Sequence, residues 1–210
     1  MENIISIFVR SIFIDNMVFA FFFGMCSYIA VSKSVKTAMG LGIAVIFVMV
    51  MTVPINYLLN EVILSPGALG WINPAYGPGG ESEIDLSFLS FIVFIAVIAS
   101  FVQLVEMVVE KFAPALYNQL GIFLPLIAVN CAIMGGSLFM QERDYASLGE
   151  ATAFAAGSGI GWWLAIILMA AIRERLSYSN ISAPLRGAGI TFILTGLMGI
   201  AFMTFMGIQL

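Results

Sequence analysis

GIFLPLIAVNCAIMGG, residues 121–136, is an apolar stretch that nevertheless carries a proline, an asparagine, a cysteine and a pair of glycines. Pro125 before Cys131 and the glycine pair after it favour a kinked or interrupted helix. A second cysteine, Cys26, closes another apolar stretch, FFFGMC at residues 21–26, shortly before a lysine. A straight helix would put Cys26 near the membrane surface, so a depth equal to that of Cys131 requires a broken or re-entrant segment. The sequence therefore predicts a helical protein with each cysteine at an interrupted helix.

The composition places the whole chain in a membrane. Of its 210 residues, 61% are hydrophobic and 10% are charged, and the mean hydropathy is +1.07. Such a chain is too apolar for a soluble globular domain. Its length leaves room for about six spans of roughly 20 residues, so we expect a single membrane domain over residues 1–210. The net charge of −4 gives no reason to expect a nucleic-acid partner.

Six apolar segments are the predicted spans of this all-α integral membrane protein. They lie near Ile4–Ala30, Ala38–Leu58, Leu86–Val109, Tyr117–Met140, Glu150–Ala171 and Gly187–Gly207. The first three form one half of the chain, residues 1–112, and the last three form the other, residues 113–210. The only long connection, Asn60–Asp85, is rich in glycine, proline and acidic residues, so we expect a surface loop with Trp71 and Tyr76 at headgroup level.

Basic residues set the expected orientation. Six of them fall in the first, third and fifth connections: Lys33, Lys36, Lys111, Arg173, Arg175 and Arg186. Only Arg10 and Arg143 fall on the other side of the predicted membrane. The positive-inside rule therefore places those three connections in the cytoplasm and both termini on the periplasmic side.

The two halves share a pattern that suggests an internal duplication. Cys26 is followed by GLG at residues 40–42, and Cys131 is followed by GIG at residues 159–161. Three spans per half would give the copies opposite topologies, related by an axis in the membrane plane where binding sites gather. Chance is the alternative, because glycine is common in membrane helices, where it allows close helix approach.

The two cysteines leave several interpretations open. A cysteine buried in a membrane helix often acts only as a small apolar residue, and a disulfide is a second alternative. A zinc site is disfavoured because the chain has no histidine and no third cysteine. Two thiolates are half of the ligand set of a Cys₄ iron–sulfur cluster, so an iron site would need a second chain. Interrupted helices would aim the positive ends of their dipoles at such an anionic group.

Further motifs surround the cysteines. They are SIFIDN at 11–16, FFGMC at 22–26, VSKSVKTAMGLG at 31–42, the opening stretch at 121–136, and GSGIGW at 157–162. Together they resemble, essentially end to end, the E subunit of the sodium-translocating NADH:quinone oxidoreductase, a family related to the A and E membrane subunits of the Rnf complex. The shared motifs alone do not separate the two complexes. The connection near Trp71–Asp85 is longer than the family pattern leads us to expect.

The resemblance implies a fold, a cofactor and partners. In that family, the homologous D and E subunits are each inverted 3+3 bundles, inserted with opposite topologies in a six-subunit complex of the bacterial inner membrane. They are thought to share one [2Fe–2S] cluster, with two cysteines from each, which here are Cys26 and Cys131. Electrons from NADH would pass from a flavin and iron–sulfur subunit through this cluster to flavins and ubiquinone, coupled to Na⁺ export. The chain would thus be part of a translocase but not catalytic alone.

A sodium pump needs oxygen ligands within or beside its spans, since Na⁺ is a hard cation. Gln103, Glu106 and Glu110 recur at i, i+3 and i+7 along the third predicted span, with Glu106 the best candidate. The alternative interpretation is a wetted helix end beside Lys111.

Asp15, together with Asn16 in the first predicted span, is the second candidate for the sodium pathway. Its alternative role is an ion pair with Arg10 or with a neighbouring subunit, because buried charges are usually paired. Asn130, next to Cys131, is expected to satisfy the backbone of the broken helix or the cluster sulfurs.

Two other function classes remain open. Inverted 3+3 repeats with broken helices also build secondary transporters, which would bind substrate with this chain alone and would carry no iron. A purely structural membrane protein would keep electron transfer intact when Cys26 is replaced by serine.

Overall fold

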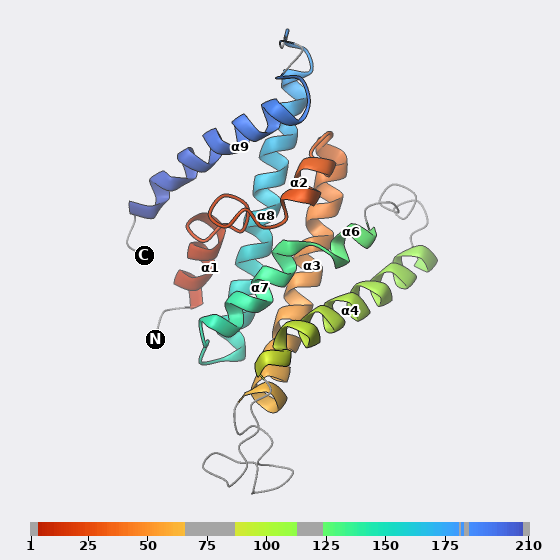
Figure 1. The fold of residues 1–210 in the computed structure, drawn as a ribbon, viewed down its shortest axis with the longest axis vertical. Coiled ribbons are helices and arrows are strands. Elements are labelled where there is room, and N and C mark those ends of the chain that lie inside the picture. Colours follow the sequence, from red (N-terminus) through yellow and green to blue (C-terminus); the bar gives the residue numbers. More distant parts are fainter. Residues whose placement is uncertain (1–3, 66–86, 113–123, 181, 183–184, 208–210) are drawn as a thin grey trace, which may run out of the picture.

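The computed structural model describes residues 4–65, 87–112, 124–180, 182 and 185–207, and throughout these ranges the regular secondary structure is helical (Figure 1). In chain order the elements are α1 (Ile4–Phe13), α2 (Met25–Val31), α3 (Val35–Leu59), η1 (Asn60–Leu64), η4 (Ser87–Leu89), α4 (Ser90–Phe112), α6 (Leu124–Ala128), α7 (Cys131–Glu142), α8 (Leu148–Leu176), α9 (Ala188–Met203) and η6 (Thr204–Gly207). The all-α class is therefore confirmed for the described residues.

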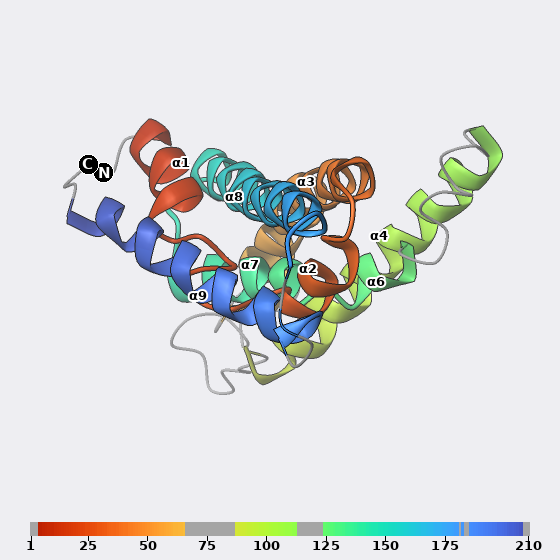
Figure 2. The ribbon, with the colours of Figure 1, turned by 90° about the horizontal axis from the view of Figure 1, so that it is seen from above.

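The long helices α3 and α8 run side by side through the centre of the molecule (Figures 1 and 2). Glycines at their crossing allow the backbones to approach. A Cβ atom on Gly42 of α3 would collide with the indole ring of Trp163, and one on Gly159 of α8 would lie 3.1 Å from the Cα of Ile46. Gly42 of the GLG motif and Gly159 of the GIG motif thus face the partner helix, which confirms the packing role predicted for these two glycines.

A second close contact joins α1 to α8. A Cβ atom on Gly157 would lie 2.6 Å from the carbonyl oxygen of Phe8, and one on Gly161 would lie 2.9 Å from that of Ile12. Since both neighbours are backbone atoms, which cannot rotate away, α1 can pack here only against a helix without side chains at these positions.

Three helices in the described ranges are long and apolar enough to cross a membrane: Val35–Leu64, Ser90–Val108 and Leu148–Leu176. They coincide with the second, third and fifth predicted spans. Two further apolar helices, Ile4–Phe13 and Ala188–Met203, are shorter. The count of six spans and the periplasmic placement of the termini stay predictions.

The interruption predicted in the first span is confirmed, because α1 ends at Phe13 and α2 begins only at Met25. One predicted boundary differs from the structure. The long connection was predicted to start at Asn60, and this starting point is wrong, because the helix continues as a π-helix to Leu64. Ser65 N donates to Asn60 O over 2.9 Å. The rest of that connection, with Trp71 and Tyr76, and the predicted start of the fourth span at Tyr117 lie outside the described residues.

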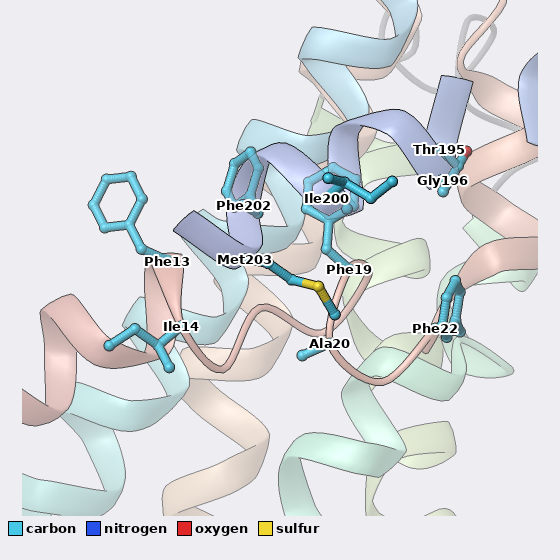
Figure 3. A pocket seen from close by; sticks show the side chains of 11 residues that line it. Phe13, Ile14, Phe19, Ala20, Phe22, Thr195, Gly196, Ile200, Phe202 and Met203 are labelled. Atoms are coloured by element: carbon cyan, nitrogen blue, oxygen red, sulfur yellow. The ribbon is translucent and has the colours of Figure 1, made fainter. Parts of the chain in front are cut away.

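The helices α4 and α9 lie at the periphery, on different sides of the central pair (Figure 2). Helix α4 packs on α3, α6 and α7, whereas α9 lies beside α8 and the segment that joins α1 to α2. Between α9 and that segment is an apolar cavity of about 280 Å³, with Phe13, Phe19 and Phe22 on one side and Thr195 and Gly196 on the other (Figure 3). Each peripheral helix also exposes large apolar side chains, as expected for surfaces that face lipid or other subunits.

The two ends of the α3–α8 pair carry unequal numbers of basic residues. At one end Arg173 Nη1, near the end of α8, donates to Ser32 Oγ, just before α3, over 2.6 Å. At the other end Tyr57 Oη donates to the carbonyl oxygen of Tyr145 over 3.0 Å. The first end therefore collects Lys33, Lys36, Arg173 and Arg175, while Arg143 lies at the second, which is the grouping that the predicted orientation requires.

Candidate functional site

The segment that joins α1 to α2 is anchored by Asn16, a buried residue whose amide is fully used. Its Nδ2 donates to the carbonyl oxygens of Ile12, at 3.0 Å, and Gly161, at 2.9 Å. Its Oδ1 accepts from the backbone N–H groups of Val18, at 3.0 Å, and Phe19, at 3.3 Å. One side chain thus ends α1, shapes the turn after it and ties that turn to α8. The sequence did not predict that Asn16 anchors this segment.

Gly24 begins α2 with a φ angle of 75°, in the left-handed region that favours glycine. A Cβ atom here would lie 2.5 Å from Trp162 Nε1, 2.7 Å from Asn130 Oδ1 and 3.1 Å from Ala132 Cβ. Since Asn130 and Ala132 flank Cys131, the start of α2 lies directly against the start of α7. Gly24 is therefore the point at which the two cysteine-bearing segments meet.

The second interruption lies at Asn130, between α6 and α7. Asn130 Oδ1 accepts from Ala132 N over 3.1 Å and so caps α7, which confirms the predicted backbone role of Asn130. The sequence predicted that Pro125 and the glycine pair interrupt the helix, but Pro125 lies inside α6 and the glycine pair does not break α7. Gly135 and Gly136 lie inside α7, where they make room for the ring of Phe23 and the side chain of Met49.

The two cysteines begin the two short helices. Cys26 lies in the first turn of α2 and Cys131 is the first residue of α7. Both are free thiols with exposed side chains, so they do not form the disulfide considered as an alternative. Cys131 also lines an apolar cavity of about 350 Å³, together with Phe23 and with Ile95 and Ile98 of α4.

Beneath this junction lie two buried donors. Trp162 Nε1 and Asn130 Nδ2 have no hydrogen-bond partner among the described residues, although Trp162 is fully buried and Asn130 is 1% exposed. Buried donors without partners are rare in folded proteins. Within the described ranges no three of the residue types Cys, His, Asp and Glu gather as a complete metal site. Cys26 and Cys131 are the two free thiols that these segments carry.

Asp15 lies apart from the sulfurs in a network of opposite charges. Its Oδ2 lies 3.2 Å from Arg10 Nε and 2.9 Å from Arg143 Nη1. Arg143 also lies over the rings of Phe139, at 5.7 Å, and Phe154, at 5.4 Å. Burial lowers the pKa of Arg143, but hydrogen bonds to Asp15 and Tyr145 more than offset this and leave that pKa above its ordinary value. The predicted pairing with Arg10 is confirmed, and Arg143 is a partner that the sequence did not reveal.

The polar residues of α4 separate into two environments. Phe94, Ile98 and Val102 are buried and recur every four residues, and Glu106, half-buried, continues this inward stripe. The other two members of the predicted polar face, Gln103 and Glu110, are exposed. Glu106 follows Ile98 by eight residues, about 12 Å along the helix axis. The structure thus brings Glu106, but not its two neighbours, onto the face of α4 that lines the Cys131 cavity.

This arrangement can be compared with known proteins. The Rnf-Nqr subunit family of membrane proteins matches residues 4–209. The chain belongs to the Rnf-Nqr family. Three relatives, each named as the E subunit of Na(+)-translocating NADH-quinone reductase, illustrate the similarity. The proteins of Stutzerimonas stutzeri and Psychromonas ingrahamii are 56% and 58% identical over 210 residues, the full length of both chains in each comparison. That of Rhodopirellula baltica is 54% identical over 212 residues, which cover 100% of this chain and 99% of the relative.

Membership of the Rnf-Nqr family agrees with the three apolar helices long enough to cross a bilayer, so the chain is a membrane protein. The match covers both interrupted segments and both peripheral helices. The family resemblance seen in the sequence motifs is thereby confirmed.

Proposed function

We propose that this chain is the E subunit of a bacterial sodium-translocating NADH:quinone reductase, a redox-driven Na⁺ pump of the inner membrane. Relatives with that name are at least 54% identical over essentially their whole length. No NADH, flavin or quinone chemistry needs to reside in this chain, which acts as a membrane component of the complex and is not catalytic alone. NADH and the flavins belong to other subunits in this proposal.

The proposal assigns Cys26 and Cys131 as half of the ligand set of a [2Fe–2S] cluster. The observation that carries it is the meeting of two helix starts at Gly24, each with a free, exposed thiol. Exposed sulfurs fit a cluster whose remaining ligands come from outside the chain, here from two cysteines of the homologous D subunit. Such a cluster, when bound, supplies a one-electron carrier within the membrane.

The residues around the sulfurs hold them in place. Asn16 fixes the segment before α2, Asn130 caps α7, and Gly24 allows the two segments to touch. The dipole of the 12-residue helix α7 has its positive end at Cys131, which favours negative charge there. Fixed supports of this kind limit the rearrangement of sulfur ligands when an electron arrives or leaves.

An inverted repeat of residues 1–112 and 113–210 accounts for the arrangement. In each half a short helix, an interruption with a cysteine directly after it, a long helix and a peripheral helix follow in the same order. The long helices of the two halves pack on each other, and each peripheral helix lies against the interrupted segment of the other half. A two-fold axis would pass through the α3–α8 contact. With this repeat the chain would have six spans and both termini on one side of the membrane, which the basic residues make the periplasmic side.

For the sodium pathway the geometry favours Glu106 over Asp15. Asp15 already balances two arginines, whereas no ion pair holds Glu106 to another described residue. A carboxylate on the inward face of α4 can supply a hard oxygen ligand to Na⁺ near the Cys131 cavity. Glu110, exposed and one turn nearer the cytoplasmic end, would then line the approach to Glu106, and the exposed Gln103 would lie one turn beyond it.

The ligand assignment is tested by the iron content of the purified complex. We expect Cys26→Ser and Cys131→Ser each to remove the two iron atoms of one cluster. Met134→Leu is the matched control, because Met134 lines the same cavity as Cys131 and carries no thiol. Unchanged iron in either serine variant would contradict the assignment and favour a structural or transporter role.

A further inference from the structure

A cavity of about 380 Å³ lies between the end of α8 and the start of α9, away from the cysteines. Its polar lining consists of Arg173, Ser177, Ser179 and Arg186, and its apolar lining includes Leu176 and Ile190. The lining residues include two guanidinium groups and two hydroxyls and no carboxylate. This composition matches an anion with several oxygen acceptors.

One arginine of this cavity is held in a fixed position. Arg173 Nη1 donates to the carbonyl oxygen of Ile29, at 2.9 Å, and to Ser32 Oγ, at 2.6 Å. These bonds use one nitrogen of the guanidinium and leave Nε and Nη2 as donors. Within the described ranges neither Arg173 nor Arg186 forms an ion pair with a carboxylate. Both positive charges are therefore available to a ligand.

The start of α9 adds further donors. Gly187, with a φ angle of 102°, precedes the helix and provides no side-chain cap for its first N–H groups. Gly187 and Ile190 both line the cavity, so the first turn of this 16-residue helix borders it. The positive end of the helix dipole thus adds to the two arginines.

We infer that this cavity binds a phosphate group. Lys33 and Lys36 gather at the same end of the molecule, which the charge distribution assigns to the cytoplasmic side. The cytoplasmic leaflet offers anionic phospholipid headgroups, and the cytoplasm offers free phosphate. Leu176 and Ile190 beside the polar lining suit the glycerol and first acyl carbons of a phospholipid. The site also links the α8–α9 connection, through Arg173, to the end of the helix that begins beside Cys26.

The test compares Arg186→Gln with Arg175→Gln in the intact, delipidated complex. Both arginines are exposed and lie at the same end of the molecule, but only Arg186 lines the cavity. One arm adds phosphatidylglycerol or phosphatidylcholine in nanodiscs and counts retained lipids by native mass spectrometry. The other arm titrates inorganic phosphate calorimetrically in detergent.

We expect wild type and Arg175→Gln each to retain one more molecule of phosphatidylglycerol than Arg186→Gln. The affinity of Arg186→Gln for phosphatidylglycerol should be lower than that of wild type by on the order of tenfold. Binding of phosphatidylglycerol alone identifies a lipid headgroup as the ligand. Binding of inorganic phosphate that Arg186→Gln loses identifies free phosphate. The inference would be overturned if Arg186→Gln and Arg175→Gln bound phosphatidylglycerol equally and also bound inorganic phosphate equally. This holds whether both variants bind as wild type does or both bind less.

Discussion

Replacing Gly24 by alanine tests whether the two cysteine-bearing segments meet as described. Two costs add at this position. An L-residue at a φ of 75° in the left-handed region costs about 1–2 kcal/mol. The new Cβ would also lie 2.5 Å from Trp162 Nε1 and 2.7 Å from Asn130 Oδ1. Because both neighbours are buried, relieving the overlap costs about 1–3 kcal/mol more. The expected destabilisation is the sum, about 2–5 kcal/mol.

Two other glycines separate these costs. Gly187 has a φ angle of 102°, but no atom of the described residues beyond its chain neighbours lies within 4 Å of the position that a Cβ would take, so Gly187→Ala carries the backbone cost alone, about 1–3 kcal/mol. Gly196 lies inside α9 with equally open surroundings and an ordinary helical φ, so Gly196→Ala is expected to be neutral or to stabilise by up to about 1 kcal/mol.

The assay is the thermal midpoint of the purified complex, followed by fluorescence-detected size-exclusion chromatography after heating, with iron content measured on the same samples. Gly24→Ala should give the lowest midpoint, Gly187→Ala an intermediate one and Gly196→Ala the highest. Gly24→Ala should also lose iron, because both sulfur-bearing helix starts would shift. Equal midpoints for Gly24→Ala and Gly196→Ala would refute the reasoning, since neither the backbone cost nor the crowding by Trp162 and Asn130 would then be present at Gly24.

Three further predictions concern single side chains. Asn16→Ala removes four hydrogen bonds of a buried amide. At a net value of about 1 kcal/mol or less for each bond, the variant should be destabilised by about 3 kcal/mol in the same thermal assay. An unchanged thermal midpoint would mean that Asn16 does not anchor the interruption. Asp15→Asn leaves two arginines without their shared carboxylate and should destabilise by about 1–3 kcal/mol, more than Arg10→Gln, because Arg10 is 45% exposed and Asp15 only 13%; the reverse order would contradict the network. Glu106→Gln should raise the Na⁺ concentration needed for half-maximal quinone reduction. Glu110→Gln, at an exposed position of the same helix, should leave that concentration unchanged. Equal sodium dependence in wild type and Glu106→Gln would show that Glu106 is not part of the sodium pathway.

Patterns of neighbouring residues predicted the long membrane helices and the two helix interruptions. Runs of about 20 apolar residues identified α3, α4 and α8, since hydrocarbon requires such runs. The interruptions at Cys26 and Cys131 were also predicted, from the position of Cys26 near a lysine and from the proline and glycines around Cys131. The capping role of Asn130 followed from its place beside a break.

Contacts between distant parts of the chain could not be predicted. Asn16 donates a hydrogen bond to Gly161, 145 residues later, and Asp15 forms an ion pair with Arg143 in the other half. Nothing in the neighbourhood of either residue encodes these partners. The contact of Gly24 with Trp162 and Asn130 depends likewise on how α8 and α7 pack, which is a property of the whole bundle. Such contacts decide where the sulfurs lie, so the sequence could name the candidate ligands but not the junction that holds them.

The central claim is that Cys26 and Cys131 jointly supply half of the shell around one intramembrane iron–sulfur centre. Electron paramagnetic resonance of the dithionite-reduced complex tests it most directly, with Cys26→Ser and Cys131→Ser compared with Met134→Leu. We predict that each serine variant loses or alters the same single [2Fe–2S] signal, while Met134→Leu and the signals of other subunits stay as in wild type. A spectrum unchanged in either serine variant would contradict the assignment of both cysteines.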